Sequence, residues 1–317
     1  MAATTPDPSP LVSIGVPVYN GEQYLEEALD SLVNQTYANL EIIICDNAST
    51  DRTEEICRSY MARDGRITYT RHGANIGASR NYNATFAPAR GKYFKWQAHD
   101  DICHPEMIAR CVEVLEADEE PVLAYPGTRL IEANGSFMED FTAVTGEGDE
   151  PRPSQRLSML LDVPPRDSIL NMCFPVFGLM RHSTLLRTGL IRNTPRSDMI
   201  LLVELSMLGR FQKYPDFHFL RRTHADSSVE TAGRGTSRTE KERRLAAWYD
   251  PNRGKRFPMT QTKLALGYGR AVLVGRMGPV ERVRTLGVYL RWVARNWRLL
   301  GGDMKLGLKD WLRPGKA

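Results

Sequence analysis

The 317-residue sequence lacks the features that mark membrane-spanning, disulfide-bonded or zinc-binding proteins. No run of 18 or more uncharged apolar residues occurs, so we expect no membrane-spanning helix. The five cysteines are scattered and form no C-x-x-C pair, which argues against a zinc site or a disulfide framework and favours reduced thiols in a cytoplasmic protein. Residues 1–10 have neither a positive segment nor an apolar core, so they predict a disordered tail rather than a secretion signal.

The formal net charge of +4 is distributed unevenly along the chain. From Asn252 onward, 15 Lys and Arg residues stand against three acidic residues, which gives this part +12 and leaves −8 for the rest. This division predicts an acidic body with a basic arm that meets an anionic surface.

Apolar, β-branched runs alternate with helical patterns in the first part of the chain. We expect strands at 11–18, 40–45 and 67–70, and helices at 22–32 and 52–62. Such alternation predicts a parallel sheet built from β-α-β units, in which ligands gather at the carboxyl ends of the strands. Asp46 and Asp100 both follow predicted strands, so we expect them on the same rim.

The second part of the chain changes pattern after residue 101. Its expected elements are helices at 104–117 and 199–208 and strands at 122–125, 129–133, 177–181 and 217–222. Asn134-Gly135 is a strong hairpin signal. The polar segment 227–239 contains glycine and predicts the boundary of the main domain.

The adjacent carboxylates of Asp100 and Asp101 close an aromatic-rich segment, 91–101. Two neighbouring carboxylates are costly to bury unless a hard divalent cation and its phosphate ligand lie between them. A solvated turn is the alternative interpretation of this pair.

Five blocks in this order resemble the family 2 glycosyltransferases, which use the GT-A fold and generally invert the anomeric centre. The blocks are Val16–Asn20, Cys45–Asp51, Asn75–Asn81, Gly91–Asp101 and Ser197-Asp198, and the resemblance covers roughly residues 11 to 225. It implies an α/β fold of GT-A type, with a Rossmann-like, mostly parallel central sheet flanked by helices, followed by a helical basic C-terminal extension.

The resemblance and the linker pattern together predict the domain organisation. After the tail at 1–10, a GT-A domain occupies 11–230, with a nucleotide-binding half at 11–101 and an acceptor half at 102–230. A flexible linker and a basic helical region fill 231–317.

The resemblance also implies how the donor is bound. Three residues of the first turn would line the nucleotide cleft: Pro17, Tyr19 and Asn20. Asp46 would accept the N3–H of a uracil or thymine ring, although an N-cap for the helix at 52–62 is the alternative. Asn75 and Arg80 lie in a loop-to-helix block where the arginine would meet a phosphate or base, unless Arg80 is only a solvated helix charge.

Asp100 and Asp101 look like the end of the family's Asp-x-Asp metal element, although Ala98 stands in place of the usual first aspartate. The resemblance therefore implies Asp101 as a ligand of Mn²⁺ or Mg²⁺ and places Asp100 on the donor ribose or the metal, with metal dependence left open. His224 lies where related enzymes supply a late metal or phosphate contact, and a purely structural histidine is the alternative.

Asp198 matches the acidic residue that opens the helix facing the acceptor in this family, so the resemblance makes it the general base. A helix N-cap is the alternative role for Asp198. Glu204, farther along the same helix, is the reserve candidate.

Residues 279–300 carry an amphipathic helical pattern that we expect to end at Gly301-Gly302. The apolar face would comprise Leu286, Leu290, Val293, Trp297 and Leu300, with Arg284, Arg291, Arg295 and Arg298 opposite. Such a helix fits an anionic membrane surface, or else docks on the body with its arginines in solvent. Nucleic-acid binding is not expected.

The resemblance thus implies an inverting glycosyltransferase of hexosyltransferase type. The cysteine pattern predicts that it is cytoplasmic, and the basic arm, in its membrane-binding interpretation, predicts that it is peripheral to the inner face of a membrane. The donor would be a UDP-sugar, with dTDP- or GDP-sugars second, and the acceptor a hydroxyl in a cell-envelope polysaccharide, a glycolipid or a glycosylated metabolite. One alternative is a non-catalytic GT-A-like scaffold that binds nucleotide sugar, which the missing first aspartate suggests. A nucleotidyltransferase is the other, and the first turn lacks the glycine-rich phosphate loop that such enzymes need.

Overall fold

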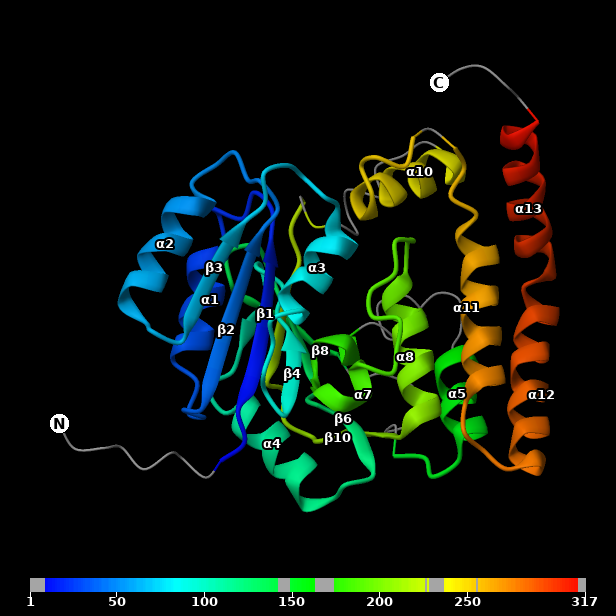
Figure 1. Cartoon of the computed structure of the whole chain (residues 1–317), viewed down its shortest axis with the longest axis horizontal. Coiled ribbons are helices and arrows are strands. Elements are labelled where there is room, and N and C mark those ends of the chain that lie inside the picture. Colours follow the sequence, from blue (N-terminus) through cyan, green and yellow to red (C-terminus); the bar gives the residue numbers. More distant parts are fainter. Residues whose placement is uncertain are drawn as a thin grey trace.

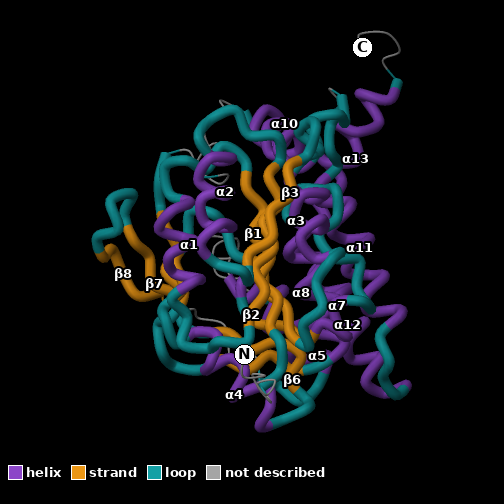
Figure 2. Tube along the Cα trace, turned by 60° about the vertical axis from the view of Figure 1, so that its left-hand side comes forward, coloured by secondary structure: helices purple, strands orange, loops and turns teal. Residues whose placement is uncertain are grey.

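The computed structural model describes residues 9–141, 149–162, 174–225, 227, 237–254 and 256–312. A seven-stranded sheet with strand order β10-β6-β9-β4-β1-β2-β3 forms its centre. Helices α1 and α2 cover one face of this sheet, and α3, α7 and α8 cover the other (Figure 2). The predicted α/β class with a central sheet between helices is confirmed.

The first part of the chain, residues 11–101, is built from parallel strands, as the sequence pattern predicts. The strands are β1 (Val12–Val18), β2 (Leu40–Asp46), β3 (Ile67–Arg71) and β4 (Tyr93–Trp96), and the helices are α1 (Leu25–Val33), α2 (Thr53–Arg63) and α3 (Ala78–Phe86). Every residue of β1 and β2 is buried, because both faces of these strands are covered.

Gly15 allows α3 to lie directly on β1. A Cβ atom at this position would come within 2.3 Å of the Thr85 hydroxyl of α3. A larger residue would therefore push away the helix whose amino end carries the Asn75–Asn81 block.

The rest of the large sheet mixes strand directions. It contains β6 (Pro121–Tyr125), β9 (Leu179–Arg181) and β10 (Arg210–Lys213), with α4 (Met107–Ala117) packed on β6. Strand β9 is antiparallel to both β4 and β6, while β10 is parallel to β6. Strand β10 has no counterpart in the sequence prediction, because its four residues carry three polar side chains.

A second, four-stranded sheet joins segments that are far apart in the chain. Its order is β5-β11-β7-β8, comprising β5 (Ile102–Cys103), β11 (Phe219–Arg222), β7 (Thr128–Ile131) and β8 (Phe137–Phe141). The hairpin predicted at Asn134-Gly135 connects β7 to β8, and Gly135 adopts a φ of 84° there. Strand β5 directly follows Asp100 and Asp101, so this sheet fixes the acidic segment from one side.

The helices of the later part of the chain lie on one side of the sheet, with α12 and α13 outermost (Figure 1). They are α5 (Pro153–Leu161), α7 (His182–Leu185), α8 (Ser197–Leu208), α10 (Arg238–Tyr249), α11 (Thr260–Val274), α12 (Pro279–Arg295) and α13 (Trp297–Trp311), with a short 3₁₀ turn at Phe174–Phe177. Tyr268, Val272 and Val288 belong to the same buried cluster as the apolar residues of α8, so the C-terminal helices share the core of the body.

Two details of the predicted helix at 279–300 are wrong. The helix is interrupted at Asn296, and Gly301 and Gly302 lie inside α13 instead of ending it. The Asn296 amide side chain donates to the Trp292 carbonyl at 2.9 Å and so caps α12, an arrangement that periodicity does not reveal.

The buried face of α12 also differs from the predicted one. Thr285 and Val288 are the buried residues of α12, which packs against α5 and α11, whereas Leu290 and Trp297 are exposed. The docking of this helix on the body, one of the two predicted outcomes, is therefore observed.

Among the described residues, no helix combines the length and apolar character that crossing a membrane requires.

Candidate active site

The carboxyl ends of β1, β2 and β4 form one rim of the large sheet. Strand β1 pairs in parallel with both neighbours, and Val18 at its end lies opposite Asp46 at the end of β2. Asp100 and Asp101 follow β4 on the other side of β1. The predicted placement of Asp46 and Asp100 on a common rim is therefore observed.

Asp46 is fully buried at this rim and makes several contacts. Its Oδ1 accepts the Ser49 backbone N–H at 2.8 Å, and its Oδ2 accepts the Tyr69 hydroxyl at 2.8 Å. The Arg71 Nε lies 3.4 Å from the same Oδ2. A nucleotide base would reach this carboxylate only if Tyr69 or Arg71 moved aside.

The first turn supplies an exposed ring and a strained backbone. Tyr19 is 43% exposed beside the rim, while Pro17 is buried within β1. Asn20 adopts a φ of 49°, a left-handed conformation that asparagine tolerates. Its Oδ1 accepts the Thr50 backbone N–H and its own N–H donates to the Ser49 hydroxyl, both at 2.9 Å. Asn20 therefore ties the loops that follow β1 and β2 together.

The block before α3 is held in place by amide side chains. The Asn75 Oδ1 accepts from the Asn47 side chain and from the Gly77 backbone, both at 2.9 Å. The buried Asn81 donates to the Cys45 carbonyl at 2.9 Å, which fixes α3 to the end of β2. Arg80 is exposed, and its side chain forms no hydrogen bond or ion pair with any described residue, so its guanidinium is available to an anion.

The acidic pair lies against a histidine at the rim. His224 Nε2 is 2.9 Å from the Asp100 Oδ2, and its ring packs 4.6 Å from the Tyr24 ring, centroid to centroid. When Nε2 donates to Asp100, Nδ1 carries the lone pair, and this buried atom has no hydrogen-bond partner among the described residues. Asp101 is 4% exposed, and its Oδ1 accepts the Arg222 backbone N–H at 2.9 Å.

The two neighbouring carboxyl groups differ in their electrostatics. Burial raises the pKa of Asp101, and the negative charge of Asp100 raises it further, against smaller opposing effects of Arg222, Arg221 and Lys95. Burial also acts to raise the pKa of Asp100, but the hydrogen bond from His224 and the nearby charges hold that pKa below its usual range. A bound divalent cation would favour the ionised form of both groups, and the unpartnered Nδ1 of His224 is a further ligand atom. Two carboxylates and an imidazole are donors of the kind that bind a divalent metal, although the three do not come together within 4.8 Å as one ligand group among the described residues.

Arg222 organises this segment, and sequence reasoning did not single it out. Its side chain is fully buried and donates to the Asp100 carbonyl at 3.0 Å, to the Ala133 carbonyl at 2.9 Å and to the Glu27 carboxylate at 2.6 Å. Its guanidinium also lies 4.7 Å from the centroid of the Tyr24 ring. An arginine at the end of a short strand carries no sequence signal of such burial.

Asp198 lies in the first turn of α8, as predicted. The charges of Asp198 and of the acidic pair all affect the pKa of the Tyr82 hydroxyl. Desolvation raises the pKa of Tyr82, and the charges of Asp100, Asp101 and Asp198 raise it further. All three carboxylates therefore lie within electrostatic range of one phenol, a residue that the sequence analysis did not name.

Glu204, the reserve candidate, is occupied elsewhere. One of its oxygens accepts the Gly189 backbone N–H at 2.8 Å, and the other pairs with Arg192. It holds the loop between α7 and α8 in place.

A different histidine pair brings potential metal ligands together away from this rim. Ligand atoms of His104, Glu106 and His218 all lie within 4.8 Å of one another. The His104 and His218 rings, however, are stacked at 4.2 Å with an angle of 7° between their planes. Because a histidine ligand binds a metal in the plane of its ring, one ion cannot satisfy both parallel rings until one of them turns. This cluster lies beyond the opposite end of β11 from Asp101.

Comparison with known proteins identifies relatives of the first half of the chain. The family model described as Glycosyl transferase family 2 matches residues 13–181. An uncharacterized glycosyltransferase of Rickettsia prowazekii is 42% identical over 125 residues, which cover 39% of this chain and 38% of the relative. The chain thus matches well under half the length of that relative.

Solved structures of similar fold cover nearly the whole chain. TarS 1-349 of S. aureus has a TM-score of 0.64 at 15% identity, covering 92% of this chain and 74% of that one. The same fragment in complex with UDP-GlcNAc has a TM-score of 0.54 at 15% identity, covering 91% of this chain and 92% of that one. The mannosyltransferase PcManGT of Pyrobaculum calidifontis, in complex with GDP-Man and Mn²⁺, has a TM-score of 0.51 at 17% identity, covering 99% and 90% of the two chains.

Proposed function

The chain belongs to glycosyl transferase family 2, and from this membership we propose that it transfers a sugar from a nucleotide-sugar donor to a hydroxyl acceptor with inversion at the anomeric carbon. A UDP-sugar is our first choice of donor, with dTDP- and GDP-sugars second. The acceptor belongs to a polysaccharide, a glycolipid or a glycosylated metabolite. The observation that carries the proposal is the common rim at the carboxyl ends of β2 and β4, where Asp46 and the adjacent Asp100 and Asp101 lie on either side of β1.

The donor site in this proposal follows the rim. Asp46 and the turn of Pro17, Tyr19 and Asn20 receive the nucleoside, with Asn75 supporting the adjacent loop. Arg80 and the end of β4 face its diphosphate. UDP-GlcNAc in TarS and GDP-Man in PcManGT are donors of the kind expected here.

In the proposed reaction the Asp198 carboxylate removes the proton of the acceptor hydroxyl. The acceptor oxygen then forms a bond to the anomeric carbon on the face opposite the diphosphate, while the bond from that carbon to the diphosphate oxygen breaks. A positioned carboxylate base contributes roughly 10²- to 10⁴-fold to such a step. Inversion follows from the single displacement.

Asp101 and His224 are the residues that would hold a divalent metal, and Asp100 contacts the Nε2 side of the His224 ring. The metal, Mn²⁺ or Mg²⁺, would neutralise the charge that develops on the departing nucleoside diphosphate. The fold holds these carboxylates in place: His224 contacts Asp100, and the Arg222 backbone N–H donates to Asp101. The Mn²⁺ bound by PcManGT supports a metal in this fold.

Ligand-dependent stability tests the donor and the metal together. We expect one of UDP, GDP, dTDP and CMP to stabilise the protein with Mn²⁺ and much less with EDTA, by about 2.7 kcal/mol at 100 times its dissociation constant. Absence of any shift would favour the alternative, a non-catalytic scaffold, which the Ala98 substitution motivates.

Replacement of the proposed base tests the chemistry. Asp198→Asn should bind the nucleotide as the wild type does but release nucleoside diphosphate from the donor sugar about 10²- to 10⁴-fold more slowly. Asp216→Asn, an exposed aspartate away from the rim, is the matched control and should keep its activity. Turnover that survives in Asp198→Asn would remove this residue from the mechanism.

We also propose that the protein works at the cytoplasmic face of an anionic membrane, through a stripe along α12 and α13. The stripe consists of Val283, Leu290, Trp297, Met304 and Trp311, each more than half exposed and seven residues apart. A basic residue follows each of the first four, namely Arg284, Arg291, Arg298 and Lys305. Seven residues span almost two helical turns, so the pairs keep to one side within each of the two helices. Aromatic, aliphatic and basic side chains in such a row suit a membrane interface.

A further inference from the structure

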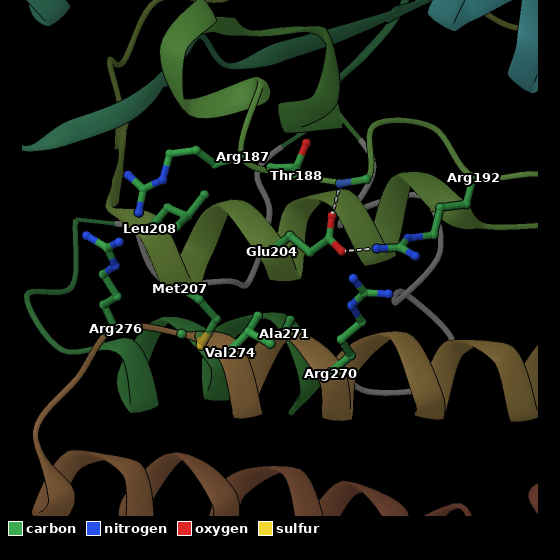
Figure 3. Close-up of a pocket in the computed structure, with 12 residues that line it drawn as sticks. Arg187, Thr188, Arg192, Glu204, Met207, Leu208, Arg270, Ala271, Val274 and Arg276 are labelled. Atoms are coloured by element: carbon green, nitrogen blue, oxygen red, sulfur yellow. Dashed lines mark hydrogen bonds and ion pairs between the residues drawn. The ribbon is translucent and has the colours of Figure 1, made fainter.

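A strongly basic pocket lies between α8 and α11, apart from the rim (Figure 3). Its volume is about 370 Å³. Four arginines and one glutamate are the charged residues of its lining: Arg187, Arg192, Arg270, Arg276 and Glu204. None of Asp100, Asp101 and Asp198 lines it, so the pocket is separate from the proposed reaction centre.

The one carboxylate in the pocket is already used. Glu204 binds the Arg192 guanidinium with one oxygen and the Gly189 backbone N–H with the other. It therefore compensates one of the four positive charges. Three guanidinium charges remain without an opposite charge in the lining.

The remaining arginines also keep their hydrogen-bond donors available. Arg187, Arg270 and Arg276 are exposed, and within the described part of the chain their side chains form no hydrogen bond or ion pair. Figure 3 shows Arg187 and Arg276 on one side of Glu204, with Arg192 and Arg270 on the other. The Nε of Arg192 is buried and has no acceptor among the described residues.

Such an arrangement favours an anion with several oxygen atoms. Like charges held close together repel one another, and a multiply charged anion between them removes that cost. Guanidinium groups bind phosphate through paired, charge-assisted hydrogen bonds. A phosphate group has enough oxygen atoms to bind several of these arginines at once, whereas a single carboxylate does not.

The pocket also has an apolar side. Met207, Leu208, Ala271 and Val274 line it, and the exposed Leu186 and Leu273 are the chain neighbours of Arg187 and Val274. A small inorganic anion would leave these side chains in water. A ligand with an apolar portion would cover them.

We propose that this pocket binds the phosphate or diphosphate group of a ligand that also carries an apolar portion. The inference goes beyond the proposed glycosyl transfer, because it concerns a second anion site on the opposite part of α8. Asp198 and Leu208 are ten residues apart on that helix, which is roughly 15 Å along its axis. A ligand whose phosphate binds here could reach Asp198 only if the rest of the ligand were about that long.

Titration with inorganic pyrophosphate in EDTA tests the phosphate site without the metal of the rim. The full-length wild type should bind pyrophosphate, and the double variant Arg270→Gln/Arg276→Gln should bind it at least about tenfold more weakly. Arg63→Gln on α2, at the far side of the molecule, is the control for loss of a single surface charge and should bind as the wild type does. Arg187→Gln provides a second test in case the double variant does not fold.

Binding of UDP with Mn²⁺ should be the same in the wild type and in all these variants. A failure of the donor proposal would therefore show in the UDP titration, and a failure of the present one in the pyrophosphate titration. No pyrophosphate binding by the wild type, or equal binding by the pocket variants, would overturn the site.

Vesicles of phosphatidylcholine with and without phosphatidic acid distinguish the two sources of the phosphate. If the pocket variants lose binding to both pyrophosphate and phosphatidic acid vesicles, the site is supported and its phosphate belongs to a lipid headgroup. If the variants lose only the binding of pyrophosphate, the site is supported and its phosphate belongs to a soluble ligand. Loss of vesicle binding with unchanged pyrophosphate binding would contradict the proposal.

Discussion

Arg222 is a buried cation whose hydrogen bonds join three parts of the fold. Its side chain contacts the acidic segment after β4, the hairpin between β7 and β8, and Glu27 on α1. A buried charge of this kind is tolerated only while its acceptors remain in place. The orientation of Asp100 and Asp101 therefore depends on a residue that follows them by more than a hundred positions.

Replacing this arginine should loosen the acidic segment. Arg222→Met keeps most of the side-chain volume but leaves Glu27 and two carbonyls without their donor, so we expect a loss of about 3 kcal/mol in the free energy of unfolding. Urea denaturation measures the loss, and Mn²⁺-dependent stabilisation by UDP should weaken in parallel. Arg221→Met, at the neighbouring and partly exposed position, is the control and should cost less than about 1 kcal/mol. Equal effects at the two positions would contradict the role given to Arg222.

Glu41 gives the molecule an acid-sensitive contact between β1, β2 and the loop before β4. Burial acts to raise the pKa of Glu41, but hydrogen bonds from Ser13 and from the backbone and side chain of Arg90 lower it overall. The Ser13 hydroxyl donates at 2.5 Å and the Arg90 Nη2 at 2.8 Å. The carboxylate form is therefore the one that stabilises the fold.

The pH dependence of stability should reveal this contact. Because the folded-state pKa is depressed, the contribution of Glu41 is complete above its ordinary value of 4.5 and is lost as the pH falls through the folded-state pKa. The stability difference between the wild type and Glu41→Gln should thus be largest near neutral pH and shrink in acid. Denaturation curves that stay equally far apart at every pH would rule this out.

At the scale of elements, the contact between α8 and α11 decides the position of the C-terminal helices. A Cβ atom at Gly267 of α11 would lie 2.8 to 3.0 Å from three side-chain atoms of Ile200, which is buried on α8. The glycine therefore permits a close approach of the two helices that also form the basic pocket. Gly301 and Gly302 of α13 serve no such purpose, since nothing lies within 4 Å of a Cβ atom at either position.

Two alanine substitutions at helical glycines should therefore have opposite effects. Gly267→Ala should destabilise the protein by about 1–3 kcal/mol through overpacking against Ile200, reduced by the better helix propensity of alanine. Gly301→Ala should stabilise it by up to about 1 kcal/mol, because only the propensity changes. Thermal or urea unfolding of both variants measures this. A shift of the same sign in both would show that the helix contact has little influence.

At the scale of the whole molecule, positive charge gathers at the C-terminal side. The part from Asn252 onward carries +12, and its outermost helices present the row of apolar and basic pairs described above. Helices α12 and α13 form the outer edge of the molecule, away from α1 and α2 (Figure 1). In the proposed membrane contact, this side would meet the anionic surface and the rim would stay free.

Cosedimentation with vesicles tests this membrane contact. The wild type should bind phosphatidylglycerol-containing vesicles more tightly than neutral ones, and added salt should weaken the binding. Leu290→Ser/Trp297→Ser should reduce it at least about tenfold without loss of stability, since both side chains are exposed. Phe137→Ser, which removes an equally exposed ring from β8, is the control. Unchanged binding by the double variant would exclude the stripe as the membrane contact.

The sequence by itself determined the elements whose cause is local. The buried parallel strands follow from continuous β-branched runs, the hairpin from Asn134-Gly135, and the common rim from the direction of parallel strands. The order of five motif blocks was enough to identify the family. These features depend on neighbouring residues or on the repeating geometry of one element.

Only the tertiary structure decided which residues meet across the fold. Arg222 became a buried cation through Glu27 and Ala133, far from it in sequence. Packing against α5 and α11 determines which side of α12 is buried, and the periodic pattern of one helix does not reveal this. The basic pocket is likewise lined by three separate segments, the loop after α7, α8 and α11. The physical reason is that burial and charge pairing are set by contacts between distant segments, and no local propensity encodes them.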